Sequence, residues 1–259
     1  MSEIFSPTVL KDKVSIVTGA GRGLGKVMAL ALADAGSDII LTARTVDEIE
    51  HTAKEVTDMG RKALAVKMDI TRSDDISKMV EKAVSEFGKI DILVNNAGQN
   101  ASYANHSFED IPEDEWIEMI QTNVNGTFLV TRIVGRSMLE KGEGKIVNIS
   151  SSFGVKAIPT RICYSVSKAA VIQMTRSVAV EWGSRGVTVN CIAPGSINMF
   201  PDSTNEEYLA MNRERVKIVP QGRLGRPEEL CPLIIYLASE ASDYINGETI
   251  FLDGGLAAR

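Results

Sequence analysis

A tyrosine and a lysine four residues apart, Tyr164 and Lys168 in the segment YSVSK, have side chains that could move a proton. On a helix, both side chains would lie on one face. A phenol with a pKa near ~10 is a poor base at neutral pH, but a neighbouring positive charge lowers that pKa. The pair could therefore act as a general acid or base. On a solvent-facing helix the same two residues would do no chemistry.

Seven short apolar runs alternate with longer amphipathic stretches, and these elements would position the pair. Within each run, apolar and polar residues alternate only weakly, as expected for strands covered on both faces of a parallel sheet. They lie at 13–18, 38–43, 62–68, 91–96, 144–150, 187–193 and 248–253. Helices are predicted near 23–36, 46–59, 73–87, 113–140, 161–184 and 226–239. This order predicts an α/β fold with a doubly wound, seven-stranded parallel sheet and helices on both faces.

No linker or internal repeat divides the chain, so we predict one domain over residues 1–259. The stretch from Ser196 to Gly225 is an exception to the regular pattern, because it contains no clean strand. Loops of that length often bind ligands. We therefore expect a substrate-binding loop around 196–225.

A glycine-rich turn, TGAGRGLG from Thr18 to Gly25, directly follows the first predicted strand. Its glycines at 19, 23 and 25 permit a sharp strand exit and a close approach of the backbone to a pyrophosphate. The helix that follows offers free N–H groups and its positive end. A glycine turn between a first strand and a first helix predicts dinucleotide binding.

The end of the second strand should distinguish NADP from NAD. A carboxylate there would accept the ribose hydroxyls and repel a 2′-phosphate. The sequence has Ala43 followed by Arg44, and Arg22 lies in the glycine turn. Two guanidiniums suit a phosphate, so we expect NADP(H), with NAD(H) as the alternative. The competing interpretation is that both arginines are ordinary surface residues.

Two further segments would lie beside the cofactor, because the carboxyl ends of parallel strands line the ligand crevice. Asp69 follows the third strand and is placed to accept a hydrogen bond from the adenine amino group. The segment NNAG, Asn95 to Gly98, ends the fourth strand.

Eight motifs occur in one order, and through them nearly the whole chain resembles the classical short-chain dehydrogenase/reductase family. They are TGAGRGLG, MDIT, NNAG, TNVNGTF, GKIVNISS, YSVSK, APGSI and INGETIFLDGG. In general character the chain is most similar to 3-oxoacyl carrier-protein reductases and to gluconate or glucose dehydrogenases. The resemblance implies a Rossmann fold and hydride transfer between a nicotinamide and a ketone or secondary alcohol.

The resemblance implies four catalytic residues, Asn123, Ser151, Tyr164 and Lys168. Ser151 lies thirteen residues before the tyrosine, as is usual in the family, and would donate to the substrate oxygen. Lys168 would lower the pKa of Tyr164 and hold the nicotinamide ribose, and Asn123 would hold a water that links the lysine to solvent. Ser150 and Ser152 are interpreted as neighbours that shape the strand end.

The cofactor contacts expected from these patterns are Gly19, Arg22, Gly23, Leu24, Gly25, Arg44, Asp69, Ile70, Asn96, Ala97, Gly98, Tyr164, Lys168, Pro194, Gly195 and Ile197. Two positions depart from the family's pattern. Gly21 replaces the serine of many NADP-linked members, which removes one phosphate donor. Met199 replaces a threonine that often contacts the nicotinamide carboxamide, so that contact is not expected here.

The substrate is left open by the sequence. We expect walls at Gln99 to Ser107, at Phe153 to Ile158 and in the 196–225 segment. Their residues include Val155, Ile158, Phe200 and Tyr208 together with Asn198 and Asp202, a mixture of apolar and polar side chains. A 3-oxoacyl thioester is our first expectation, and a sugar or polyol is the alternative. A third reading is a sensor that binds NADP without turnover.

Composition restricts which other partners and ligands the protein could bind. The formal net charge of −6 gives no electrostatic case for nucleic acid. Two histidines and three scattered cysteines (Cys163, Cys191 and Cys231) predict no metal site and free thiols in a reducing compartment. No apolar run reaches the ~18 residues of a membrane span, so we expect a cytoplasmic protein. The resemblance implies a homotetramer joined through helices near 113–140 and 161–184 and the C-terminal strand.

Overall fold

Seven parallel strands form one sheet in the computed structural model, which describes Ser6, residues 8–99 and residues 106–258. The strands are β1 (Val14–Thr18), β2 (Asp38–Ala43), β3 (Ala63–Lys67), β4 (Ile92–Asn95), β5 (Gly144–Ile149), β6 (Val187–Pro194) and β7 (Thr249–Leu252). Their order is β3-β2-β1-β4-β5-β6-β7. This arrangement confirms the predicted doubly wound sheet. The strand order reverses beside β1 and β4, where sheets of this kind bind ligands.

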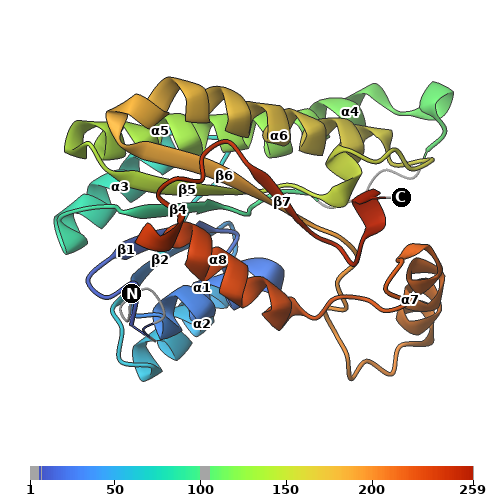
Figure 1. The fold of residues 1–259 in the computed structure, drawn as a ribbon, viewed down its shortest axis with the longest axis horizontal. Coiled ribbons are helices and arrows are strands. Elements are labelled where there is room, and N and C mark those ends of the chain that lie inside the picture. Colours follow the sequence, from blue (N-terminus) through green and yellow to red (C-terminus); the bar gives the residue numbers. More distant parts are fainter. Residues whose placement is uncertain (1–5, 7, 100–105, 259) are drawn as a thin grey trace.

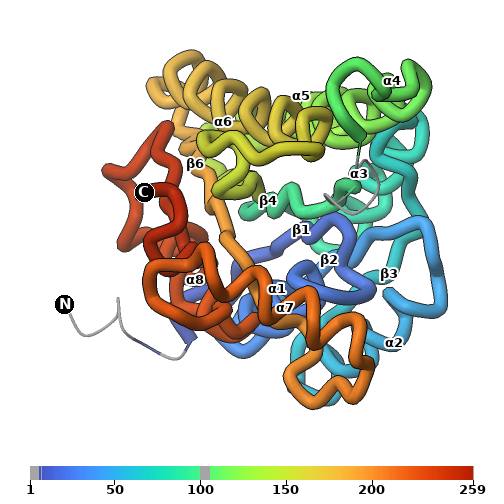
Figure 2. The backbone as a smooth tube through the Cα atoms, turned by 90° about the vertical axis from the view of Figure 1, so that its right-hand side faces the viewer, coloured from blue at the N-terminus to red at the C-terminus, as the bar shows by residue number. Residues whose placement is uncertain are grey.

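Helices cover both faces of the sheet, as Figures 1 and 2 show. One face carries α3 (Ser73–Phe87), α4 (Glu113–Ile120), α5 (Thr127–Lys141) and α6 (Ile162–Trp182), and the other carries α1 (Gly23–Asp34), α2 (Val46–Asp58) and α8 (Cys231–Ala238). Alternate strand residues therefore enter different cores. Val17 and Leu41 pack in one core, whereas Ile16 and Ile40 pack in the other. Burial on both faces explains why the central strands show little alternation in the sequence.

The helix predicted over 113–140 is interrupted. A π-helical segment, Gln121–Gly126, separates α4 from α5 and contains Asn123. Gly126 packs so tightly that an added Cβ would lie 2.7 Å from Ile70 Cδ1. Apolar periodicity does not reveal such a widened turn, which is frequently found at functional sites.

The segment 196–225, expected to be a substrate-binding loop, contains a helix that the sequence analysis did not predict, α7 (Glu206–Ile218). Asn205 caps this helix by accepting a hydrogen bond from the Tyr208 N–H at 2.9 Å. Its first turn is acidic and its last turn is basic, which complements the helix dipole. A parallel bridge between Ile197 and Gly225 closes the base of the segment. We call residues 196–225 the α7 lobe.

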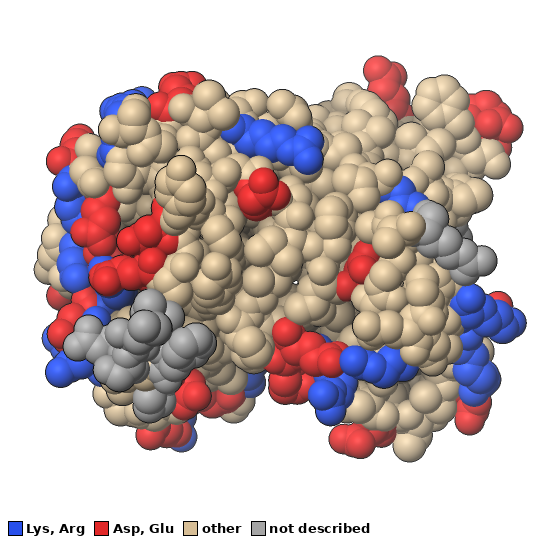
Figure 3. Space-filling model, viewed as in Figure 1, with Lys and Arg blue, Asp and Glu red and all other residues tan. Residues whose placement is uncertain are grey.

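Charged side chains of both signs are interspersed around the edge of the face in Figure 3, and uncharged residues fill much of its centre. Among the described residues, no helix is long and apolar enough to cross a membrane. That same part of the chain contains no group of three or more His, Cys, Asp or Glu that could hold a metal ion. All three cysteines have free thiols, as predicted, although Cys231 is only partly buried.

Candidate active site

The glycine turn forms a cradle that side chains would fill. Gly19 and Gly23 have positive φ angles of 66° and 59°, which glycine adopts without strain. A Cβ on Gly25 would lie 2.1 Å from the carbonyl oxygen of Gly19, so only glycine permits this close approach. No side chain caps the start of α1 at Arg22, and no acidic residue lies in its first turn. These features fit the pyrophosphate of a dinucleotide.

Partly buried hydrogen bonds join the turn after β1 to the turn after β4. The Thr18 hydroxyl accepts hydrogen bonds from the N–H groups of Asn96 and Ala97, each at 3.0 Å. The Asn96 side chain donates back to the carbonyl oxygens of Thr18 and Gly19, at 2.9 and 3.2 Å. Gly19, Asn96 and Ala97 are thus brought together as expected. The contribution of Thr18 was missed, although a polar residue ending an apolar strand was its signal.

Glu48 is a further residue that the sequence did not indicate. An added Cβ on Gly21 would lie 2.6 Å from Glu48 Cβ, so a serine would not fit at this position without movement. The Glu48 carboxylate also lies 4.0 Å from Arg22 Nε, and the Arg22 side chain is largely exposed. A negative charge therefore lies beside one of the two arginines expected to bind a phosphate.

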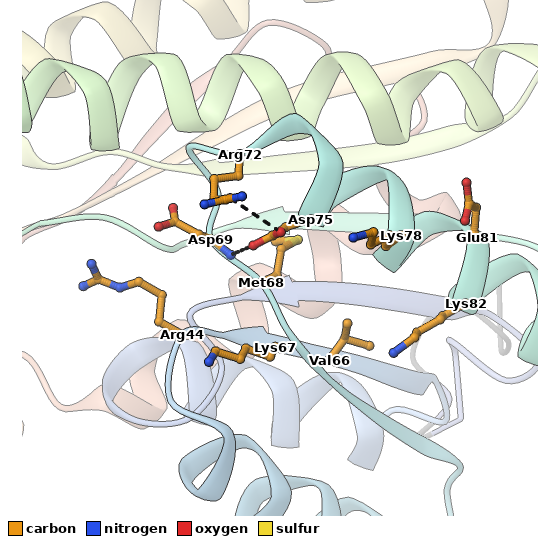
Figure 4. A pocket seen from close by; sticks show the side chains of 10 residues that line it. All are labelled: Arg44, Val66, Lys67, Met68, Asp69, Arg72, Asp75, Lys78, Glu81 and Lys82. Carbon is orange, nitrogen blue, oxygen red and sulfur yellow. Dashed lines mark hydrogen bonds and ion pairs between the residues drawn. The ribbon is translucent and has the colours of Figure 1, made fainter.

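A cavity of about 670 Å³ lies between β3 and α3 (Figure 4). It is lined by Arg44, Val66, Lys67, Met68, Asp69, Arg72, Asp75, Lys78, Glu81 and Lys82. Arg44 and the Asp69 carboxylate point toward one end of it, and Lys78 and Lys82 lie at the other. Two residues predicted at the adenosine end of the cofactor thus share one cavity. A second cavity, of about 530 Å³, lies beside β7 and includes Ser196 and Asp253, and neither cavity is lined by Tyr164 or Ser151.

Asp69 is held as a carboxylate. One of its oxygens accepts hydrogen bonds from the Thr71 N–H and hydroxyl, at 2.9 and 2.8 Å. Burial alone would raise the pKa of Asp69, but these hydrogen bonds and the charges of Arg44 and Arg72 hold it below its ordinary value. Its second oxygen is the acceptor that the predicted adenine contact would use.

Tyr164, Ser151 and Lys168 meet where β5 ends beside α6. Lys168 Nζ lies 5.7 Å from the centre of the Tyr164 ring and donates to the Ile149 carbonyl oxygen at 2.9 Å. Ser151 lies two residues beyond the end of β5 and hydrogen-bonds the Tyr164 side chain. The structure therefore brings together three of the four predicted catalytic residues.

Burial sets the pKa values of this group. It raises the pKa of Tyr164, and the hydrogen bond with Ser151 opposes this shift only in part. The direction is opposite to the lowering expected from Lys168, because desolvation disfavours the phenolate. Burial also lowers the pKa of Lys168 to about 8. The lysine is thus still mainly protonated at neutral pH.

Asn123, the fourth predicted residue, connects the β4 turn to α6. Its side-chain oxygen accepts from the Gln99 N–H at 2.7 Å, and its amide donates to the Gln99 carbonyl at 3.1 Å and to the Ser167 hydroxyl at 3.0 Å. Ser167 in turn donates to the Tyr164 carbonyl oxygen at 2.7 Å. A Cβ on Gly98 would lie 2.8 Å from the Asn123 side-chain oxygen and 3.8 Å from Lys168 Nζ. Asn123 therefore positions the segment that passes the lysine.

The two serines flanking Ser151 fix the end of β5, as expected. Ser150 donates to the Lys168 carbonyl oxygen at 2.8 Å, and Ser152 donates to an Asp253 carboxylate oxygen at 2.9 Å. Asp253 also crowds Gly195, where an added Cβ would lie 2.6 Å from Asp253 Cβ. The close packing of β6 against the end of β7 explains why the segment after Pro194 begins with glycine.

The predicted substrate walls are only partly described. Residues 100–105 of the wall expected at Gln99 to Ser107 lie outside the described residues. Val155 and Phe200 are exposed, and Tyr208 and Ile158 are half-buried. Tyr208 packs edge-on against Phe200 with ring centres 5.7 Å apart. Met199 packs against the core beneath the lobe.

Comparison with known proteins agrees with this geometry. A family model described as enoyl-(acyl carrier protein) reductase matches residues 19–257. The 2-dehydro-3-deoxy-D-gluconate 5-dehydrogenase of Dickeya dadantii is 38% identical over 255 residues, covering 96% of this chain and 97% of that protein. The 3-oxoacyl-(acyl-carrier-protein) reductase of Thermotoga maritima is 35% identical, covering 95% and 98%.

A solved structure of gluconate 5-dehydrogenase from Burkholderia cenocepacia, in complex with NADP and tartrate, is also similar. It superposes with a TM-score of 0.89 at 32% identity, covering 98% of each chain. The fold and the site thus define an NAD(P)-dependent dehydrogenase or reductase of the Rossmann type. The chain belongs to the classical short-chain dehydrogenase/reductase family.

Proposed function

We propose that this chain is an NADP(H)-dependent oxidoreductase that interconverts a ketone and a secondary alcohol, with Tyr164 as the acid and base. The observation that carries the proposal is the meeting of Tyr164, Ser151 and Lys168 beside Gly98, at the strand ends next to the glycine cradle. When bound, the cofactor supplies or accepts the hydride.

Each residue of the group has a defined task in this proposal. In reduction, the Tyr164 hydroxyl donates its proton to the ketone oxygen, and its raised pKa keeps that proton in place until it is needed. Ser151 donates a hydrogen bond to the same oxygen as negative charge develops there. Lys168 supplies positive charge near the tyrosine, and Asn123 positions Gln99 and Ser167 around it.

NADP(H) is proposed as the cofactor. Arg44 is exposed and forms no ion pair within the described part of the chain, and Ala43 leaves no carboxylate at the end of β2. The similar enzyme from Burkholderia cenocepacia binds NADP. The other proposed contacts are those predicted from the sequence, with Arg22 weakened by Glu48. NAD(H) stays the alternative, to be decided by comparing KM for NADPH and NADH.

Two substrate classes compete. Similarity to 3-oxoacyl-(acyl-carrier-protein) reductase favours a 3-oxoacyl thioester, the first expectation from the sequence. Similarity to dehydrogenases of gluconate and of 2-dehydro-3-deoxy-D-gluconate favours a sugar acid or polyol. The hydrogen-bonded polar side chains of Asn198, Tyr208 and Asn212 in the α7 lobe favour the second class. A non-catalytic sensor is the least supported function, because all four predicted catalytic residues are present.

Purified protein tests the proposal with NADPH and a panel of ketones that includes a 3-oxoacyl thioester and keto sugar acids. Steady oxidation of NADPH that is lost in Tyr164→Phe is the expected result. Turnover that survives Tyr164→Phe unchanged would show that the acid is misassigned. Binding of NADPH without turnover of any carbonyl compound would support the sensor instead.

A homotetramer and a cytoplasmic location are proposed as well. Ile117, Phe128 and Val180 on α4, α5 and α6 are 57%, 46% and 86% exposed, which leaves apolar side chains for a partner subunit to cover. Val171 on α6 lies in the interior of this subunit, so it is not available to such an interface. Light scattering coupled to gel filtration would measure the mass in solution, and a monomer would contradict the proposed assembly.

A further inference from the structure

The end of β2 lies between two other strands, because the order at this edge of the sheet is β3-β2-β1. On the β1 side follows the glycine turn with Arg22, and on the β3 side lies Lys67, the last residue of that strand. Lys67 is the register partner of Ala43, the last residue of β2. The Met68 N–H donates to the Ala43 carbonyl oxygen at 2.9 Å, which fixes this register at the strand ends. Lys67 is therefore the direct neighbour of the position where a carboxylate would favour NAD(H).

Lys67 leaves the sheet on the face that carries α1 and α2. Ala63 and Ala65 of β3 pack against the core shared with these helices, whereas Val66 packs in the other core. Because side chains alternate along a strand, Lys67 lies on the same face as the two alanines. Ala43 packs against that core as well. Neighbouring strands lie about 4.8 Å apart, a distance that the four-carbon stem of a lysine spans. The Lys67 ammonium can therefore reach a group bound at the end of β2.

The cavity between β3 and α3 brings Lys67 together with Arg44. Both residues line it, and Figure 4 shows both near the end toward which the Asp69 carboxylate points. Lys78 and Lys82 also line the cavity, but they lie at its other end. Two cations from adjacent strands thus share the predicted adenosine end of the cofactor site, and two cations of α3 are separate from it.

The cations around the end of β2 differ in how far acidic groups offset their charge. Arg22 has the Glu48 carboxylate 4.0 Å from its Nε, and Arg44 shares its end of the cavity with the Asp69 carboxylate. Lys67 is exposed and forms no ion pair or side-chain hydrogen bond with the residues that the structure describes. A phosphate monoester carries a charge of about −1.5 to −2 at neutral pH, more than one guanidinium compensates. Lys67 supplies the further positive charge that such a group requires.

We propose, resting on the use of NADP(H) proposed above, that Lys67 is a further specificity-determining residue, which binds the 2′-phosphate from β3 while Arg44 binds it from the end of β2. Arg44 offers a planar fork of donors, and the Lys67 ammonium adds a compact charge on a flexible stem. Ala43 places no carboxylate between the two. NADH carries only a hydroxyl group at this position, so Lys67 contributes little to its binding. Selection of the phosphate thus depends on β2 and β3 more than on the glycine turn.

Calorimetric titration of the purified protein with NADP⁺ and with NAD⁺ tests the proposal without turnover, because the two ligands differ only in the 2′-phosphate. Lys67→Gln should weaken NADP⁺ binding about three- to tenfold, as expected for a charge contact at an exposed site, and leave NAD⁺ binding unchanged. Lys67→Arg keeps the charge and should retain most of the NADP⁺ affinity. Lys82→Gln is the matched control, since it removes the same charge from the other end of the same cavity and should change neither affinity.

The outcomes separate this proposal from the proposed function. A wild-type preference for NADP⁺ that Lys67→Gln retains in full would overturn the role of Lys67 alone, and Arg22 and Arg44 would account for the preference. Equal weakening by Lys67→Gln and Lys82→Gln, or an equal loss for NADP⁺ and NAD⁺ in Lys67→Gln, would overturn it as well. Wild-type protein that binds NAD⁺ at least as tightly as NADP⁺ would contradict both this proposal and the choice of NADP(H), while the proposed chemistry at Tyr164 would stand.

Discussion

The cofactor crevice and the α7 lobe both lie at the strand ends, but they are built differently. In the crevice, the buried Thr18 hydroxyl fixes two backbone N–H groups, and Gly25 has no space for a Cβ. In the lobe, half-exposed side chains such as Tyr208 make the main contacts, and Phe200 is 65% exposed. The backbone of the crevice is therefore held in one conformation, whereas side chains of the lobe can be substituted without disturbing the core.

Two tyrosine variants should show the largest difference in kinetic effect between the active site and the α7 lobe. Tyr164→Phe removes the proposed acid, so kcat should fall by about 10²- to 10⁴-fold. Tyr208→Phe removes the hydrogen bonds to Asn198 and to the Phe200 N–H but no transferred proton, so KM for the substrate should rise with little change in kcat. Steady-state kinetics measures both. Equal losses of kcat would mean that the lobe takes part in the chemistry.

Glycine substitutions provide the next largest contrast. An alanine at Gly25 would place Cβ 2.1 Å from the Gly19 oxygen and 2.4 Å from Asn96 Nδ2. Because backbone must move, we expect Gly25→Ala to weaken NADPH binding about 10- to 100-fold, consistent with 1–3 kcal/mol of overpacking. Gly222 in the lobe has open space but a φ of 68°.

The matched variant Gly222→Ala should cost stability of about 1–2 kcal/mol through its left-handed backbone and leave NADPH affinity unchanged. Fluorescence titration with NADPH and denaturant unfolding measure the two quantities. Tight NADPH binding by Gly25→Ala would show that the cradle is less constrained than its contacts indicate.

A pH series should reveal the buried lysine of the crevice. The pKa of Lys168 is about 8 because burial disfavours its charge. We expect kcat/KM to fall about tenfold per pH unit above that value as the charge is lost. Stability should change in the opposite direction. Between pH ~8 and ~10.4 the unfolded chain binds more protons than the folded chain, so the free energy of unfolding rises with pH.

Lys168→Arg keeps its charge in this range and should move the decline in activity to higher pH if the variant remains active. Lys217→Gln, on the exposed face of α7, is the control and should leave the pH profile unchanged. Parallel loss of activity and stability above pH 8 would contradict the assignment, because it would indicate unfolding instead of titration.

The sequence predicted the crevice far better than the lobe, for a physical reason. Strands such as β1 and β4 are buried on both faces, so their apolar runs are visible without the fold. The local backbone geometry of the turn requires glycine at positions 19, 23 and 25, so their spacing in the sequence predicts this turn. The apolar runs and the glycine spacing are both properties of short segments, so they can be predicted from the sequence without knowledge of the fold.

The helix α7 was missed because polar side chains, such as Tyr208 and Asn212, form its inward contacts. Its cap at Asn205 and its charged ends were visible, but no apolar stripe accompanied them. The contact between Glu48 and Gly21 joins segments distant in sequence. Only the assembled fold reveals such pairs.

The smallest expected effect concerns Glu48, whose carboxylate lies 4.0 Å from Arg22 Nε beside the predicted phosphate site. Glu48→Gln frees Arg22 and removes a negative charge, so KM for NADPH should fall about two- to fivefold, in keeping with a weak exposed ion pair. KM for NADH should not change, because NADH has no 2′-phosphate. The effect should also diminish at high salt, which screens exposed charges.

The α7 lobe supplies the matched control for this prediction. Glu206 lies 3.9 Å from Arg213 in a similarly weak ion pair, so Glu206→Gln changes the net charge by the same amount far from the crevice. We expect it to leave KM for NADPH unchanged. If both variants lowered this KM equally, the overall charge of the protein would be responsible. If Glu48→Gln affected NADPH and NADH alike, Glu48 would act on a part of the cofactor that the two share, and Arg44 and Lys67 would be left to select NADP(H).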